Sequence, residues 1–332
     1  MTGARGAIPD ASVLDLDCEA EAHRIAEWMK AVVVGELRRR GVVVAVSGGV
    51  DSAVCLGLAV RAFGAARVHA LLLPERDSAS ESTIRGRAVC ERFGVAAQQV
   101  DIAPILEALG CYRDRDAAIR ALVPDYGDDW KSKIVIAGGN RGGINFFRLV
   151  VRSPAGVQSE RRLPLREYLQ IVAATNHKQR VRKNIEYFHA DRLNYAVVGT
   201  PNRLEYDQGF FVKNGDGAAD LKPIAHLYKT QVYAMARHLD VPEAICTSVP
   251  STDTYSLAQG QDEFYFAMPY DRMDLALWSL EHDVPAADLA AALGLSPEQA
   301  ELVYDDIRSK RRTTRPLHAP ARLIEPVLGR DD

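Results

Sequence analysis

The sequence predicts an α/β fold, a doubly wound, Rossmann-like parallel sheet with helices on both faces. Three observations support this prediction. Apolar strand segments alternate with helical segments between residues 42 and 100. The strands are apolar at successive positions, as strands covered on both sides must be. A glycine-containing turn at residues 47–52 joins the first strand to the next helix, and ligands of such sheets bind at that carboxyl edge.

The predicted elements follow one another with short connections. An amphipathic helix at 18–40 precedes the first strand and carries an apolar stripe of Ile25, Trp28, Met29, Val32 and Leu37. Strands are expected at 42–46, 69–73 and 98–100, with helices at 52–63 and 81–93. A further strand at 195–198 ends at Gly199 and Thr200, so the loop after it should reach the same sheet edge as the turn.

Two regions add to this sheet. Residues 110–165 form an insert with a glycine cluster at 138–143 and a predicted β-hairpin made of 144–151 and 157–163. Residues 286–307 predict two helices joined by a turn, a common packing unit, so a DNA-binding interpretation is disfavoured. We therefore expect a flexible N-terminus at 1–16, one domain at 17–316 and a C-terminal tail at 317–332.

Composition excludes several classes of protein. The 332 residues are 47% hydrophobic and 26% charged with a net charge of −3, so nucleic acid is not an expected partner. The five cysteines form no C-x-x-C pair, which argues against zinc, iron–sulfur and disulfide scaffolds. The sequence contains no run of about 18 apolar residues, so we expect no membrane segment and a cytoplasmic location.

The turn itself suggests phosphate chemistry. It reads Ser47-Gly48-Gly49-Val50-Asp51-Ser52, in which glycines permit close approach of an anion and the helix N-terminus and hydroxyls donate hydrogen bonds. Asp51 would oppose an anion unless a cation lay beside it. The spacing differs from G-x-x-x-x-G-K-[ST], which disfavours kinases and GTPases. The turn resembles the PP-loop ATP pyrophosphatases, which cleave ATP between its α and β phosphates and have an adenine nucleotide alpha hydrolase-like fold.

Further motifs make the resemblance more specific. They are residues 198–205, 209–223 and 227–233, with an N-x-x-x-R-x-R segment at 176–182. Residues 261–263, 269–271 and 309–312 fit more loosely. Over about residues 20–316 the chain resembles the ammonia-dependent NAD synthetase family. The resemblance implies amidation of deamido-NAD to NAD through an acyl-adenylate, with ATP as substrate and AMP and pyrophosphate released.

The resemblance also bears on partners. About forty residues precede the first strand, too few for the glutamine-hydrolysing domain of some relatives, so free ammonia is the expected nitrogen donor. A separate glutaminase subunit stays open. A homodimer is expected, because the family often binds the dinucleotide at a two-fold interface and such dimers are common.

Physical reasoning assigns the ATP end of the site. The phosphates would lie over Ser47, Gly48, Gly49 and Ser52, while Asp51 and Glu205 would hold Mg²⁺. Lys229 would bind the leaving pyrophosphate. The resemblance implies three more ATP contacts, from Arg182, Thr200 and Ser251.

The acceptor end needs a group that binds ammonium and takes up its proton. Asp216 is the candidate, with Asp220 as competitor, although either carboxylate could instead hold a loop together. The resemblance assigns deamido-NAD contacts to Asn176, Arg180, Lys213 and Asp216. Lys183 is expected on the solvated face of its helix, because the family commonly carries an apolar residue there.

Three other functions stay open. The insert at 110–165 and Ser309, where relatives often have a larger residue, could mark an enzyme that amidates another small carboxylic acid. A non-catalytic nucleotide-binding protein is opposed by the presence of Asp51, Glu205, Asp216 and Lys229. A tRNA-modifying PP-loop enzyme is favoured by the basic run at 308–315 and opposed by the acidic net charge and missing cysteine pairs.

Overall fold

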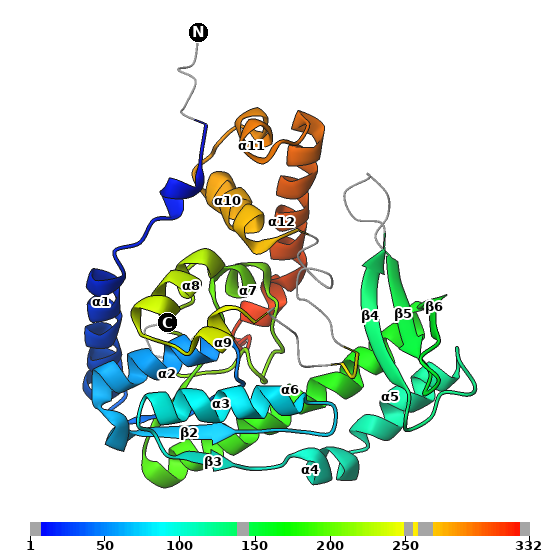
Figure 1. Cartoon of the computed structure of the whole chain (residues 1–332), viewed down its shortest axis with the longest axis horizontal. Coiled ribbons are helices and arrows are strands. Elements are labelled where there is room, and N and C mark those ends of the chain that lie inside the picture. The colour runs from blue at the N-terminus through cyan, green and yellow to red at the C-terminus, as the bar shows by residue number, and fades with distance from the viewer. Residues whose placement is uncertain (1–7, 138–145, 249–254, 258–267, 326–332) are drawn as a thin grey trace.

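The structure is a computed structural model that describes residues 8–137, 146–248, 255–257 and 268–325. At its centre is a parallel sheet in the order β3-β2-β1-β7 (Figure 1). Its strands are β1 (Val42–Ala45), β2 (Val68–Leu72), β3 (Ala97–Gln99) and β7 (Ala196–Val198). Each lies within one residue of a predicted strand, which confirms the α/β prediction.

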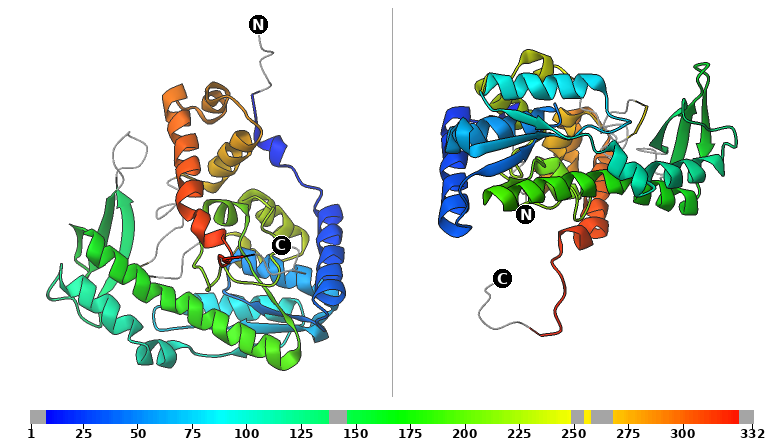
Figure 2. Two further views of the ribbon diagram at one scale, coloured as in Figure 1. Left: turned by 180° about the vertical axis from the view of Figure 1, so that it is seen from behind. Right: turned by 90° about the horizontal axis from the view of Figure 1, so that it is seen from below.

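Helices cover both faces of this sheet, as Figure 2 shows from below. One layer contains α2 (Val50–Phe63), α3 (Ser80–Arg92) and α8 (Lys229–His238). The other contains α4 (Ala103–Ala108), α5 (Cys111–Arg120) and α6 (Leu165–Leu193). Along β1, Val42 and Val44 pack into the first layer and Val43 into the second, because side chains alternate along a strand.

The first predicted helix differs in detail. Helix α1 (Cys18–Lys30) continues as a π-helical segment, η2 (Ala31–Glu36), and ends before residue 40. Ile25 and Met29 of the predicted stripe are buried, but Trp28 and Leu37 are exposed. The buried stripe instead includes the small residues Ala22 and Ala26, which allow α1 to pack closely on the main core.

The insert is a three-stranded antiparallel sheet, so the predicted hairpin was incomplete. It is formed by β4 (Lys131–Ala137), β5 (Phe146–Arg152) and β6 (Gln158–Arg162), in that order. A third strand with a buried face stabilises what would be a marginal hairpin. Leu149 and Val151 of β5 pack with Ile119 and Ile171 in a small core against α5 and α6. The glycine cluster at 138–143 lies outside the described residues.

The C-terminal helices form a layer of their own. They are α10 (Tyr270–Glu281), α11 (Ala286–Leu293) and α12 (Pro297–His318), which pack together with Leu14 near the N-terminus. Helices α11 and α12 form the predicted packing unit, and α12 extends eleven residues beyond the predicted end at 307. Shorter elements complete the chain: η1 (Ala11–Leu14), η3 (Ala65–Arg67), α7 (Arg203–Gln208) and α9 (Glu243–Cys246). Among the described residues, no helix combines the length and apolar character that a bilayer crossing requires.

A buried ion network fastens α6 to the loop after β2. The Lys178 ammonium of α6 lies 2.9 Å from Glu75 Oε1 and 2.7 Å from Asp77 Oδ2. Tyr112 of α5 donates a hydrogen bond to Glu75, and Arg115 of the same helix pairs with Asp77. Because these side chains are almost fully excluded from solvent, the network fixes how the insert, α6 and the sheet meet.

Candidate active site

The predicted phosphate-binding turn lies between β1 and α2. Gly48 has a φ of 84°, and a Cβ there would lie 2.2 Å from the Ser82 carbonyl oxygen, so only glycine fits. The Ser47 amide donates to Ser52 Oγ at 3.2 Å, and Ser52 Oγ donates to the Gly49 carbonyl at 2.9 Å. These bonds hold the Ser52 hydroxyl at the start of α2, beside the amide groups that the helix leaves unpaired. The Ser47 hydroxyl lies 3.2 Å from the Ser52 hydroxyl.

Three predicted residues from distant parts of the chain meet beside this turn. The fully buried Lys229 ammonium, at the start of α8, forms a short ion pair with Asp51 of α2. Glu205 lies in the first turn of α7. Burial and the neighbouring Asp51 carboxylate raise the pKa of Glu205 to about 8. Burial alone would lower the pKa of Lys229, but Asp51 and Glu205 outweigh it and the pKa is raised.

Asn202 organises this cluster, and the sequence analysis did not identify it. Its side-chain amide donates to Asp51 Oδ1 at 3.0 Å. Its backbone amide donates to Glu205 Oε2 at 3.1 Å, and its side-chain oxygen accepts from the Glu205 amide at 3.2 Å. The spacing Asn202-x-x-Glu205 is a capping box, a signal that the sequence does contain.

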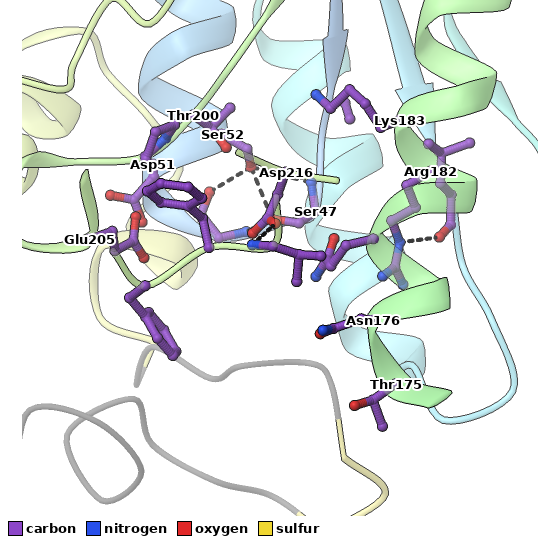
Figure 3. Close-up of a pocket in the computed structure, with 18 of the residues that line it drawn as sticks. Ser47, Asp51, Ser52, Thr175, Asn176, Arg182, Lys183, Thr200, Glu205 and Asp216 are labelled. Atoms are coloured by element: carbon purple, nitrogen blue, oxygen red, sulfur yellow. Dashed lines mark hydrogen bonds between the residues drawn. The ribbon is translucent and has the colours of Figure 1, made fainter. Parts of the chain in front are cut away.

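Helix α6 supplies a second wall. Asn176, Arg180 and Arg182 line the cavity, and Figure 3 shows Asn176 and Arg182 on the same helix. Arg182 Nε donates to the Leu73 carbonyl at the end of β2, at 3.1 Å. Arg180 Nε donates to the Lys213 carbonyl at 3.3 Å, which joins α6 to the loop after α7.

The prediction that Lys183 is solvated was wrong. Its side chain is buried, lines the cavity and forms a 2.7 Å ion pair with Glu186, one turn further along α6. The turn that carries it faces the cavity, and Glu186 supplies the charge that a buried ammonium requires. Burial raises the pKa of Glu186, in spite of the nearby Lys183. This charged pair adds to the predicted site.

The structure separates the two candidate aspartates. Asp216 lines the cavity, and its Oδ1 accepts a hydrogen bond from the Val212 amide at 2.7 Å. Burial raises the pKa of Asp216. Asp220 instead accepts from the Val197 amide of β7 at 2.7 Å and from the Tyr187 hydroxyl at 3.4 Å. Asp220 therefore holds a loop to the sheet, while Asp216 faces the space where a ligand would lie.

One cavity of about 750 Å³ brings most of the predicted residues together, a volume typical of small-molecule sites. Figure 3 shows Ser47, Asp51, Ser52, Thr200, Glu205 and Asp216 grouped at one end. Gly48 packs against α3 instead, and Ser251 lies outside the described residues. The cavity is lined by the following predicted residues: Ser47, Gly49, Asp51, Ser52, Asn176, Arg180, Arg182, Thr200, Glu205, Lys213, Asp216 and Lys229.

Among the described residues of the site, the candidate metal ligands are the carboxylates of Asp51 and Glu205. Within the described ranges, no group of three or more His, Cys, Asp or Glu side chains is arranged to hold a metal ion. Asp51 and Glu205 nonetheless lie beside the turn. Magnesium sites commonly use one or two carboxylates together with substrate phosphates, and Asp51 and Glu205 form such a pair.

The fold and the site define a class of protein: an α/β nucleotide-binding enzyme with a phosphate-binding turn, a buried lysine and paired carboxylates at the carboxyl edge of its sheet. A sequence model of the family described as NAD synthase matches residues 21–121 and 154–315. The chain therefore belongs to the NAD synthase family. The match passes over residues 122–153, which contain the whole of β4 and β5.

Individual relatives agree with this membership. The chain is 57% identical over 318 residues to the NH3-dependent NAD+ synthetase of Rhizobium meliloti (strain 1021), covering 96% of this chain and 95% of the relative. It is 41% identical to the protein of that name from Thermotoga maritima over 256 residues, 77% and 85% of the two chains. The NH3-dependent NAD synthetase structure from Campylobacter jejuni has a TM-score of 0.60 at 19% identity, with 93% and 100% covered, and shows the same fold.

Proposed function

We propose that the protein is an ammonia-dependent NAD synthetase, a ligase that forms a C–N bond. It uses ATP to amidate deamido-NAD to NAD through an acyl-adenylate and releases AMP and pyrophosphate. The observation that carries the proposal is the convergence of Asp51, Glu205 and Lys229 beside the phosphate-binding turn, in one cavity with Asn176 and Asp216. Relatives of this name match the chain over nearly its whole length.

The first step activates a carboxylate that is itself a poor electrophile. The carboxylate attacks the α-phosphate of ATP, and the bond between the α and β phosphates breaks. Ser47, Gly49 and Ser52 bind the phosphates, and Arg182 and Thr200 contact the ATP nucleotide. Ser251 is the expected further phosphate contact. Lys229 then stabilises the leaving pyrophosphate, because it is a buried cation held at the turn by Asp51.

Asp51 and Glu205 would hold Mg²⁺, which when bound neutralises phosphate charge that the two carboxylates would otherwise repel. The residues fit this role because both are carboxylates, and Asn202 holds them beside each other at the turn. Asn202 orients both carboxylates, because its side-chain amide donates to Asp51 and its backbone amide donates to Glu205.

The second step replaces AMP with ammonia. Asp216 binds ammonium and accepts its proton, so that neutral ammonia can attack the acyl carbon. Burial raises the pKa of Asp216, which makes its carboxylate a stronger base toward ammonium. Asn176, Arg180 and Lys213 hold the deamido-NAD, and all three line the cavity.

The assembly proposed is a homodimer, supplied with free ammonia or by a separate glutaminase subunit. The support is the family resemblance and the general preference for two-fold symmetric pairs.

An assay of purified protein with ATP, Mg²⁺, ammonium and deamido-NAD tests the proposal. AMP and NAD should appear in equal amounts, and omission of ammonium should stop NAD formation. Folded protein that binds ATP but yields no NAD would contradict the proposed acceptor. Another small carboxylic acid would then be the alternative acceptor.

A further inference from the structure

The inserted sheet reaches the cavity through one aromatic residue. Phe147, Leu149 and Val151 occupy alternate positions of β5 and so point to one face. Leu149 and Val151 fill the small core between the insert and α5 and α6. Phe147 comes earlier in the strand, at its cavity end, and lines the same cavity as Asp51. Strand β5 is thus held in place by the small core, and its Phe147 ring faces the cavity.

Phe147 is paired with a second ring from α6. The Phe147 and Tyr168 rings stack with centroids 4.1 Å apart and planes at 13°. Tyr168 also lines the cavity, and both side chains are only half-buried. The Leu163 amide donates to the Phe147 carbonyl at 3.0 Å, which fixes the strand at this point. The pair is a preformed flat surface that can accept another planar ring.

The length of helix α6 gives the distance between this aromatic pair and the end of the cavity at which the proposed reaction takes place. Tyr168, Asn176 and Lys183 all line the cavity, fifteen residues separate the first from the last, and the helix rises about 1.5 Å per residue. The pair thus lies roughly 20 Å along α6 from Lys183, and the charge of Lys183 acts on the cavity-lining Asp216. A ligand that spans this distance must be elongated and carry a recognisable group at each end, as a dinucleotide does.

We infer that Phe147 and Tyr168 form a stacking platform for the adenine ring of the acceptor dinucleotide, the ring remote from the carboxylate that reacts. This inference rests on the proposed function. The insert therefore determines acceptor specificity, and Phe147 is a binding residue contributed by residues 122–153, which the family match passes over. ATP, with its phosphates at the opposite end of the cavity, does not reach the platform.

The test measures KM and kcat for both substrates in two variants. Phe147→Ala removes the ring, and Phe147→Leu keeps apolar volume in case the smaller residue loosens the insert. Each should raise KM for deamido-NAD at least about fivefold, which corresponds to about 1 kcal/mol of lost stacking. Because the lost contact is made equally before and during the reaction, kcat should stay within about twofold. KM for ATP should also stay within about twofold.

Controls separate this inference from its alternatives. Val157→Ala changes an exposed residue in the turn of the same insert and should leave both KM values unchanged. An unchanged KM for deamido-NAD in the leucine variant would overturn the platform, as would a parallel rise in KM for ATP. A fall in kcat would place the reacting ring there instead. Absence of NAD formation by the unaltered protein would refute the proposed function, independently of these comparisons.

Discussion

At the scale of single residues, the buried Glu205 carboxyl beside Lys229 holds its proton more tightly than an ordinary glutamate. The pKa of Glu205 is raised to about 8 from an ordinary value of 4.5. The folded protein therefore binds more protons than the unfolded chain between these two pH values. The contribution of Glu205 to the free energy of unfolding is therefore greatest at acidic pH. It is lost as pH rises toward 8, by up to about 1.4 kcal/mol per pH unit.

Urea unfolding of the ligand-free protein at pH 5.5 and pH 8 tests this expectation. Glu205→Gln, which keeps an oxygen that accepts from the Asn202 amide, should remove the excess pH dependence seen in the unaltered protein. Identical pH slopes in the two proteins would contradict the assignment. Metal affinity should change in the opposite direction and increase toward pH 8, because only ionised Glu205 binds a cation well.

Asp51 combines a proposed catalytic role with a structural one. Asp51→Asn should lower ATP turnover at least about a thousandfold, since the cation-binding carboxylate is lost. It should also cost about 3 kcal/mol of unfolding free energy, because the buried Lys229 ammonium loses its partner. AMP release and urea unfolding measure the two effects. The control Asp240→Asn alters an exposed ion pair with Arg92 and should change neither.

The two aspartates of the loop after α7 provide a matched comparison. Asp216→Asn can still accept the Val212 hydrogen bond, so it should preserve adenylate formation and lower kcat/KM for ammonium by about a hundredfold or more. Asp220→Asn should leave the ammonium dependence intact, because Asp220 bonds to β7 and Tyr187. Pyrophosphate release and an ammonium titration measure the two steps. Equal ammonium dependence in both variants would refute the role of Asp216.

At the scale of elements, α6 connects the insert, the sheet and the cavity, and its buried Lys178 holds the loop after β2. Lys178→Met should reduce unfolding free energy by about 3–5 kcal/mol, because it leaves Glu75 buried without that cation. The double variant Lys178→Met with Glu75→Gln should recover part of this loss, since the buried charge is then removed as well.

Urea unfolding of the two Lys178 variants checks this interpretation. Arg92→Met, which breaks the exposed pair with Asp240, serves as the comparison and should cost less than about 1 kcal/mol. If Lys178→Met lost no more unfolding free energy than Arg92→Met, the network would contribute little to the attachment of α6.

At the scale of the whole molecule, the proposed homodimer predicts a mass in solution of twice 36.5 kDa. Sedimentation equilibrium over a range of protein concentrations measures it. A single species of 36.5 kDa in the presence of ATP and deamido-NAD would contradict the dimer. The division of the chain into an N-terminal segment, one domain and a tail stays a prediction.

What the sequence determined by itself is largely local. Apolar runs and their spacing predicted the sheet strands to within one residue, because burial on both faces leaves a pattern in neighbouring residues. The turn at 47–52 and the motifs that follow predicted the family and the residues that line the cavity, because phosphate binding depends on backbone shape and residue type over a few positions. Strand β4 was missed, since its partner β5 lies beyond the glycine cluster.

Tertiary structure decided which side chains are buried, which charges are paired and which residues reach the cavity. Lys183 is buried because α6 turns that face to the cavity and Glu186 supplies the opposite charge. Asp216 and Asp220 are distinguished only by which backbone amide each one meets after the loop folds back on β7. Phe147 reaches the cavity because the insert packs on α6. Burial, charge partners and ligand access depend on contacts between residues far apart in the chain, and no local pattern contains them.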